Sequence, residues 1–292
     1  MDSISLKALA KINLALDVTG VREDGYHDVR MIMQSVKLFD RVEIKKMRSG
    51  NIRVDTALYY LPNDESNLAY RAAKLMKEAY QIKDGVRISL QKYIPIAAGL
   101  GGGSSDAAAV LVGMNKLFKI GATQEELCAL GLKAGADVPF CIMRGTALAE
   151  GVGEILTPLP QMIKCPVLIV KPQVPVSTQD TYRNLKLVPG MAHPDIDQVI
   201  EGIREKDLDK IAANTGNVLE TVTIPRNPII GEIKKMMTEQ GAAVSLMSGS
   251  GPSVFGLFRT EEELYAAYTA MKASEYAKNI NVYSTEIHNN RR

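Results

Sequence analysis

The chain has 292 residues, of which 46% are hydrophobic and 23% charged, and its formal net charge is +2. It is long enough for two domains or one large one, and its composition is that of an ordinary globular protein. The small net charge gives no argument for a nucleic-acid or membrane-surface partner, and the lack of an apolar run of about 18 residues excludes a membrane-spanning helix.

The cysteines and the amino terminus indicate where the protein works. Cys128, Cys141 and Cys165 are odd in number and lack a C-x-x-C spacing, which favours a reducing compartment and argues against a zinc site. Met1-Asp2-Ser3 carries an acidic residue and leads directly into an alternating pattern, unlike a signal peptide. We therefore expect a cytoplasmic protein.

The first predicted strand carries two polar side chains on one face. From Lys11 to Val18 apolar residues alternate with polar or small ones, and this period of two predicts a half-buried strand. The alternation places Lys11 and Asn13 on the same face. Lys11 is either a sheet lysine whose stem snorkels to solvent or a fixed cation that stabilises alkoxide or phosphoryl charge.

A turn and two further strands come next. Asp24-Gly25 predicts the turn, and residues 31–39 and 41–47 predict the strands. Tyr26-His27 directly follows the turn. This pair is either a packing pair or a binding pair, in which the tyrosine stacks on a base and the histidine hydrogen-bonds it.

A strand, a helix and another strand lead to the most informative segment. Residues 52–56 predict a strand, Ser66 is a candidate N-cap, and an apolar stripe over 68–79 predicts a helix. Alternation over 86–90 predicts the next strand.

The loop after this strand is rich in glycine and ends in paired serines. It consists of Pro95, Ile96, Ala97, Ala98, Gly99, Leu100, Gly101, Gly102, Gly103, Ser104 and Ser105. Glycines let the backbone approach a bulky anion, and the helix that follows offers unpaired N–H groups and partial positive charge, so the arrangement suits phosphate. No lysine follows the glycines as in a Walker A loop, and Ser104 occupies the third glycine position of a dinucleotide fingerprint. Tight packing is the alternative role for these glycines.

Asp137 has two compatible interpretations. Thr123 and Glu126 form a capping-box pattern for a helix that ends near Gly135. Asp137 then precedes Pro139, which is typical of an N-cap. A carboxylate at this place could also receive the proton of a substrate hydroxyl.

The second half of the chain predicts a smaller α/β layer. Prolines crowd residues 158–175, where we place a domain boundary, and the chain then reads as mostly helical to about Gln240. Strands over 243–247 and 254–258 flank Ser248-Gly249-Ser250-Gly251-Pro252, which is either a simple hairpin turn or a second wall of an anionic site. A helix from Glu261 and a strand over 281–286 complete a pattern that favours a ferredoxin-like sandwich.

Three segments stand in the order of the motifs of the GHMP kinase superfamily, and the chain resembles that family over nearly its whole length. They are Ala10-Lys11-Ile12-Asn13-Leu14, the loop over 95–109, and residues 245–254. Further segments make the resemblance closest to the branch that phosphorylates a cytidine-diphosphate-linked alcohol for isoprenoid synthesis; they are Asp24-Gly25-Tyr26-His27, Gly135-Ala136-Asp137-Val138-Pro139-Phe140 and Gly151-Val152-Gly153-Glu154.

The resemblance implies an α+β, two-domain GHMP kinase fold. Residues 1–160 would form an amino-terminal domain like domain 2 of ribosomal protein S5, with the phosphate loop and the catalytic residues. Residues 161–292 would form the carboxyl-terminal ferredoxin-like α/β sandwich.

The resemblance also implies an activity and its residues. ATP would phosphorylate the 2-hydroxyl of the cytidine-linked alcohol, and Mg²⁺ would bridge the ATP phosphates. Asp137 would take or orient the hydroxyl proton, and Lys11 would hold Asp137 ionised and stabilise the oxygen. The loop from Pro95 to Ser105 would bind the ATP phosphates. Asn67 and Lys92 would belong to the adenine site, and the cytidine pocket would contain Asn13, Tyr26, His27, Thr178 and Tyr182.

Two other readings stay open at this point. The chain could be another GHMP kinase, acting on mevalonate, homoserine or a sugar. It could also be a catalytically silent member that senses a nucleotide, although a silent member has no chemical need for both Lys11 and Asp137. In each case we expect a small-molecule partner, no nucleic acid, no membrane, and a monomer or homodimer.

Overall fold

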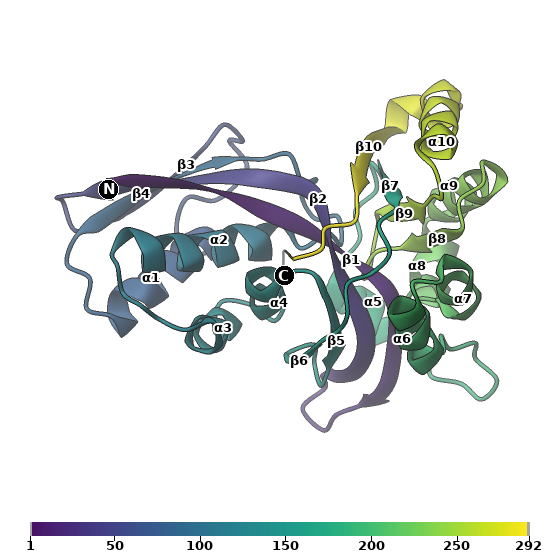
Figure 1. The fold of residues 1–292 in the computed structure, drawn as a ribbon, viewed down its shortest axis with the longest axis horizontal. Helices are drawn as coiled ribbons and strands as arrows, with labels where there is room; N and C mark the ends of the chain where they lie inside the picture. The colour runs from purple at the N-terminus through teal and green to yellow at the C-terminus, as the bar shows by residue number, and fades with distance from the viewer. Residues whose placement is uncertain (1, 291–292) are drawn as a thin grey trace. The chain divides into compact units, whose positions relative to one another are not determined.

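The computed structural model describes residues 2–290, which pack as two compact units (Figure 1). Unit 1 contains the residues up to Ala10, Leu38–Ile96 and Gly101–Arg144. Unit 2 contains Lys11–Lys37, Ala97–Leu100 and the described residues from Gly145 onward. The chain passes from one unit to the other within its first two strands and within the glycine-rich loop. The division into domains 1–160 and 161–292 stays a prediction, since these packing units divide the chain in another way.

Unit 1 is built from strands with helices along one face (Figure 1). Its elements, including two strands that it shares with unit 2, are β1 (Ser3–Val21), β2 (His27–Met47), β3 (Ile52–Thr56), α1 (Leu68–Ala79), β4 (Gly85–Gln91), α2 (Gly102–Leu117), α3 (Gln124–Leu132) and α4 (Val138–Met143). Strand β4 pairs with β3 in parallel and with the second half of β2 antiparallel. Helix α2 packs against α1, α3 and α4.

The close fit of α2 on the sheet of unit 1 depends on small residues. A Cβ at Gly113 would lie 2.5 Å from Ile44 Cδ1 on β2 and 2.8 Å from Leu6 Cδ1 on β1. Residues Ala107 to Leu111 are all buried. The apolar, Ala-rich pattern of this helix therefore fixes the element that begins directly at the glycine-rich loop.

Unit 2 contains a second, fully antiparallel sheet. Its elements are β5 (Thr146–Glu150), β6 (Ile155–Pro158), β7 (Pro166–Pro172), α5 (Thr178–Asn184), α6 (Ile196–Glu205), α7 (Leu208–Asn214), α8 (Glu220–Arg226), α9 (Pro228–Glu239), β8 (Val244–Met247), β9 (Val254–Leu257), α10 (Glu261–Ala273) and β10 (Ile280–Glu286). The strand order is β10-β7-β9-β8, and α9 and α10 pack against this sheet (Figure 1). Strands β5 and β6 form a ladder with the first half of β2. The mixture of helices and largely antiparallel sheets confirms the predicted α+β class and its carboxyl-terminal sandwich.

Most of the elements predicted from local patterns are confirmed. The strand over 52–56, the helix after the glycine-rich loop and the helix from Glu261 lie where the sequence predicts them. The capping box of Thr123 and Glu126 is complete, because each side chain accepts a hydrogen bond from the backbone of the other residue. That helix ends at Leu132, earlier than predicted.

Three expectations from the sequence are wrong, and one hairpin was not predicted at all. The two strands predicted over 31–39 and 41–47 are one continuous strand, β2, which runs through Asp40. The N-cap of α1 is Asn67 and not Ser66, because the side chain of Asn67 accepts a hydrogen bond from the backbone N–H of Ala69. Strand β1 is not half-exposed, because residues 8–16 are buried on both faces. The hairpin of β5 and β6 was not predicted.

No helix within residues 2–290 combines the length and the apolar character that a membrane crossing requires.

Candidate functional site

A buried ammonium group lies on β1 in unit 2. Lys11 is only 6% exposed, and its Nζ donates a hydrogen bond to Asn13 Oδ1 at 2.8 Å. Asn13 in turn contacts Met31 on β2, with 3.2 Å between Nδ2 and Sδ. The predicted shared face of Lys11 and Asn13 is therefore confirmed. The snorkelling interpretation is wrong, because the side chain is buried and its Nζ is bonded to Asn13 and not to solvent. The role of Lys11 as a fixed cation in the reaction stays a prediction.

The turn over Ser248–Pro252 covers this face of β1 within unit 2. A Cβ at Gly249 would lie 3.4 Å from Lys11 Nζ and 3.5 Å from Asn13 Oδ1. The turn joins β8 to β9, and both Gly249 and Gly251 have positive φ. It is a hairpin turn, which is one of the two roles open from the sequence, and it also covers the polar face of β1.

The same turn contacts the middle of the glycine-rich loop. Ser248 Oγ donates to the backbone oxygen of Gly99 at 2.9 Å, and Gly99 has φ of +73°. The backbone N–H of Lys11 donates to the carbonyl of Leu100 at 3.0 Å. The two glycine–serine segments of the sequence are thus neighbours in unit 2, beside the buried lysine.

Asn217 holds the Ser248–Pro252 turn, and sequence reasoning missed it. Its side-chain nitrogen donates to the carbonyls of Met247 and Gly249, both at 2.8 Å. The segment around Asn217 is also bonded to β1, because the N–H of Leu16 donates to the Gly216 carbonyl at 2.8 Å. Asn217 stands in a short polar link before α8, where nothing local distinguishes it from a loop asparagine.

Two further side-chain contacts join distant segments of unit 2, one between aromatic rings and one between hydroxyl groups. The rings of His27 on β2 and Tyr182 on α5 lie 5.2 Å apart between centroids, tilted by 53°. Thr178 Oγ1 lies 2.8 Å from Ser250 Oγ in the Ser248–Pro252 turn. Tyr26 is 64% exposed, beside this group in sequence. The structure therefore brings together two members of the predicted cytidine pocket, His27 and Tyr182.

The start of α2 in unit 1 has the features of an anion site. Gly101 is its N-cap in the left-handed conformation, and no side chain caps the helix. The N–H groups of the first turn therefore face outward along the helix axis with partial positive charge. Ser105 Oγ is buried instead, donating to the Leu9 carbonyl at 2.5 Å and lying 3.2 Å from Cys141 Sγ. Of the paired serines, the half-buried Ser104 is the better candidate for a ligand contact.

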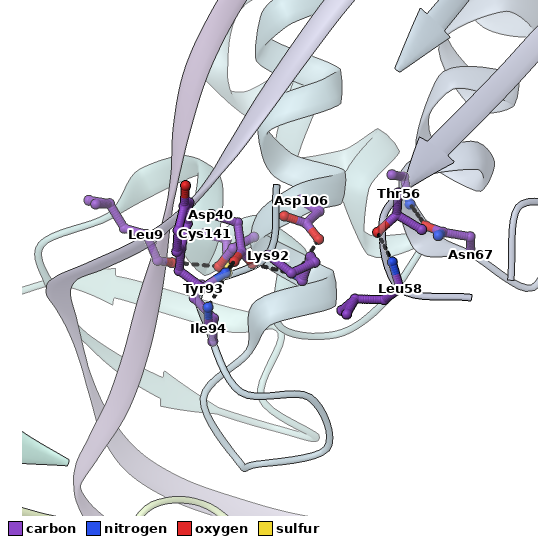
Figure 2. Close-up of polar contacts among 12 residues, drawn as sticks. Leu9, Asp40, Thr56, Leu58, Asn67, Lys92, Tyr93, Ile94, Asp106 and Cys141 are labelled. Atoms are coloured by element: carbon purple, nitrogen blue, oxygen red, sulfur yellow. Dashed lines mark hydrogen bonds and ion pairs between the residues drawn. The ribbon is translucent and has the colours of Figure 1, made fainter. Parts of the chain in front are cut away.

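The two residues predicted for the adenine site have partners within unit 1. Asn67 caps α1 and donates to the Pro62 carbonyl at 2.7 Å. Lys92 follows β4 and is buried with two carboxylates, Asp40 on β2 and Asp106 on α2 (Figure 2). Their contact with adenine stays a prediction.

The carboxylates around Lys92 have a common electrostatic environment. Burial raises the pKa of Asp106 to about 7; Lys92 opposes this rise and Asp40 adds to it. Burial alone would lower the pKa of Lys92, but Asp106 and Asp40 outweigh it and raise that pKa. Asp106 Oδ1 is buried and has no hydrogen-bond partner within residues 2–290.

We expect the Asp106→Asn variant to change how stability depends on pH. The pKa of Asp106 is about 7 in the folded chain against 3.8 for an ordinary aspartate, so the folded state holds a proton that the unfolded state loses. The contribution of Asp106 to the free energy of unfolding therefore falls as pH rises from about 4 to about 7, and asparagine lacks this fall. Denaturant unfolding of both proteins across this range measures the effect.

Asp55→Asn is the matched control for this pH experiment. Hydrogen bonds from Arg53 and Arg87 hold the pKa of Asp55 below 3.8, so its removal leaves the pH dependence above about pH 5 unchanged. A stability difference between wild type and Asp106→Asn that is constant with pH would contradict the assignment.

Asp137 stands at the N-cap position of α4 but does not cap it. Its backbone is helical, with φ of −78° and ψ of −12°, and its side chain makes no capping hydrogen bond. Pro139 occupies the first turn, as the sequence predicts. The capping interpretation therefore holds for the position and not for the carboxylate.

Within residues 2–290, no group of three or more His, Cys, Asp or Glu side chains is placed to hold a metal ion.

Comparison with known proteins gives consistent matches. The model for the GHMP kinases N-terminal domain matches residues 67–145, and the GHMP kinases C-terminal model matches residues 199–278. A 4-diphosphocytidyl-2-C-methyl-D-erythritol kinase of Lachnoclostridium phytofermentans is 52% identical over 278 residues, covering 95% of this chain and 96% of that protein. The kinase of the same name from Acetivibrio thermocellus is 52% identical over 276 residues, covering 94% and 97%.

Solved structures of kinases from the same family have the same fold as this chain. A crystal structure of 4-(cytidine 5'-diphospho)-2C-methyl-D-erythritol kinase matches with a TM-score of 0.83 and 33% identity, covering 98% of this chain and 100% of that one. A homoserine kinase from Cytophaga hutchinsonii matches with a TM-score of 0.79 at 23% identity, covering 99% and 96%, which is a likeness of fold.

Proposed function

Because the chain belongs to the GHMP kinase family, among the 4-diphosphocytidyl-2-C-methyl-D-erythritol kinases, we propose that it phosphorylates the 2-hydroxyl of 4-diphosphocytidyl-2-C-methyl-D-erythritol with ATP. The products are the 2-phosphate and ADP, in the non-mevalonate (methylerythritol phosphate) route to isoprenoid precursors. The observation that carries the proposal is the buried Lys11–Asn13 pair beneath the Ser248–Pro252 turn, next to the glycine-rich loop in unit 2.

Phosphoryl transfer depends on positioning and on charge stabilisation more than on covalent help. We assign Lys11 to the negative charge that develops on the attacking hydroxyl oxygen, and its burial and its bond to Asn13 support a fixed position. We assign Asp137 to accept or orient the hydroxyl proton.

The glycine-rich loop is our candidate for the ATP phosphates. The left-handed Gly101 and the uncapped start of α2 supply backbone N–H donors of the kind that bind phosphate. Mg²⁺ bound with ATP would bridge the phosphate oxygens and neutralise developing charge. Such an ion keeps several waters and takes further ligands from the phosphates, and the half-buried Ser104 is the residue of this loop whose hydroxyl would contact it. A cytoplasmic location and a monomeric or homodimeric state stay predictions.

We assign the cytidine end of the substrate to five residues of unit 2, which are Asn13, Tyr26, His27, Thr178 and Tyr182. The contact between the His27 and Tyr182 rings supports an aromatic pocket. The exposed ring of Tyr26 is suited to stack on the cytosine.

Truncating Tyr26 to Ala should therefore raise the KM for the cytidine substrate about 10-fold to 100-fold, the range that base stacking on an aromatic ring supports. The KM for ATP should stay near its wild-type value. Tyr265→Ala is the matched control, because Tyr265 on α10 is similarly exposed, at 71% against 64% for Tyr26. Steady-state kinetics with each substrate varied in turn measures both constants, and equal losses for the two substrates would argue against a cytosine pocket.

The proposed function is tested by offering the purified protein ATP, Mg²⁺ and a panel of alcohols. The panel contains 4-diphosphocytidyl-2-C-methyl-D-erythritol, mevalonate, homoserine and galactose. ADP release identifies turnover, and phosphorus NMR of the product identifies the hydroxyl that was phosphorylated. Turnover of homoserine or mevalonate, without turnover of the cytidine substrate, would overturn the proposal. ATP binding without turnover of any alcohol would favour a silent nucleotide sensor.

A further inference from the structure

Asp40 is a buried carboxylate that the sequence pattern passes over. It lies in the middle of β2 and is 0% exposed. Its Oδ1 accepts hydrogen bonds from the backbone N–H groups of Tyr93 at 2.5 Å and Ile94 at 2.8 Å, and its Oδ2 accepts from Lys92 Nζ (Figure 2). Both oxygens therefore hold the short segment by which the chain enters the glycine-rich loop.

Lys92 carries the connection to the other end of that loop. Its Nζ also donates to Asp106 Oδ2 at 2.5 Å, and Asp106 belongs to α2, the helix on which the loop ends. A Cβ at Gly102, in the first turn of α2, would lie 3.6 Å from the same Nζ. The ammonium group thus lies beneath the first turn of α2 and joins it to β2 within unit 1.

This cluster is costly for the fold. It places two carboxylates around one ammonium group, and burying ions costs free energy that their mutual attraction often fails to offset. Asp106 Oδ1 lacks a hydrogen-bond partner within the described residues, which adds to that cost. An apolar cluster of the same volume would stabilise the fold at least as well. The charged cluster instead fixes geometry, because a buried polar network sets the orientation of each group to which it hydrogen-bonds.

We propose that Asp40 is a positioning residue for ATP, which holds the entry of the glycine-rich loop and, through Lys92, the first turns of α2 in the geometry that binds phosphate. The proposal rests on ATP binding by this loop, as set out above. Because both ends of the glycine-rich loop are already fixed, its backbone N–H donors need not be ordered when ATP binds. The entropy cost of ordering the loop therefore does not reduce the binding free energy. Asp40 itself touches neither ATP nor the acceptor alcohol.

The test is the Asp40→Asn variant of the full chain. The amide oxygen can still accept from the backbone of Tyr93 and Ile94, but its NH₂ group replaces the oxygen that Lys92 needs. We expect the KM for ATP and the dissociation constant for ATP with Mg²⁺, measured by calorimetry, to rise about 10-fold. The KM for the acceptor and kcat at saturating ATP should change little.

Asp55→Asn is the matched control. Asp55 on β3 accepts hydrogen bonds from Arg53 and Arg87 in the same unit instead of from the glycine-rich loop, and Asp55→Asn should leave all three kinetic constants unchanged. A lower kcat with both KM values unchanged in Asp40→Asn would indicate a smaller folded fraction and would overturn the proposal. The same KM for ATP in both variants would overturn it as well.

A second variant keeps the test decisive if Asp40→Asn does not fold. Asp106→Asn removes one of the two carboxylates from Lys92 and leaves Asp40 bonded to the loop entry. It should raise the KM for ATP by a smaller factor, about threefold, with the acceptor KM unchanged; an unchanged KM for ATP would count against the proposal.

The outcomes separate this inference from the proposed function. If the wild-type protein phosphorylates the cytidine substrate but Asp40→Asn binds ATP normally, the inference fails and the function stands. If the wild type phosphorylates none of the alcohols, the function fails, and calorimetry of ATP binding still decides the role of Asp40.

Discussion

Replacing Asp137 with Asn is expected to lower kcat by about 1,000-fold while ATP still binds. General-base assistance and proton positioning by one carboxylate are typically worth about 10²-fold to 10⁴-fold in rate. Asparagine keeps the shape of the side chain but can neither accept the hydroxyl proton fully nor carry the negative charge. The side chain of Asp137 does not cap α4, so the substitution removes no capping hydrogen bond from this helix.

The control for Asp137→Asn is an aspartate that does cap its helix. Asp207 at the start of α7 accepts hydrogen bonds from the backbone of Asp209 and Lys210, so Asp207→Ala should lower stability and leave kcat intact. Coupled measurement of ADP release gives kcat, and calorimetry with ATP and Mg²⁺ gives binding. Full activity of Asp137→Asn would remove the assigned role, and a loss confined to the melting temperature would assign Asp137 to the fold.

Local chemistry made part of the fold and of the site predictable. The capping box at Thr123, the glycine-rich loop before α2 and the shared face of Lys11 and Asn13 each depend on residues within a few positions of one another. Such signals act on the backbone directly, through caps, positive φ angles and strand alternation. At these three places the local signal was therefore sufficient, whereas the N-cap predicted at Ser66 lies one residue away from the actual cap, Asn67.

Burial of polar groups could not be predicted in the same way, because the groups that cover them lie far away in the sequence. The alternation around Lys11 places Lys11 and Asn13 on one face and leaves open whether that face meets solvent, and only the turn containing Gly249 shows that it is covered. Asp40 looks like an interruption between two strands until the backbone of Tyr93 and Ile94 is seen to bond it. Asn217 gives no local signal, since its partners are the carbonyls of Met247 and Gly249.

The contact between the glycine-rich loop and the Ser248–Pro252 turn has a direct consequence for mutation. Gly99 has φ of +73°, and a Cβ on it would lie 2.1 Å from the backbone oxygen of Ser248 and 3.1 Å from that of Gly251. Backbone atoms cannot rotate away as a side chain can, so the loop and the turn must separate. The hydrogen bond from Ser248 Oγ to the Gly99 carbonyl would then be lost.

Gly99→Ala should therefore weaken ATP binding about 100-fold and lower the melting temperature, since the clash adds to the cost of a left-handed alanine. Gly190→Ala isolates the clash, because Gly190 in unit 2 has φ of +83° with nothing within 4 Å of its ideal Cβ. Calorimetry with ATP and thermal unfolding of both variants separate the two costs. If Gly99→Ala loses no more affinity or stability than Gly190→Ala, the loop can shift at this point without cost and the turn does not fix its position.

A larger loss in Gly99→Ala means that the Ser248–Pro252 turn sets the position of the glycine-rich loop. Residues that hold the turn, such as Asn217, would then act on ATP binding through it.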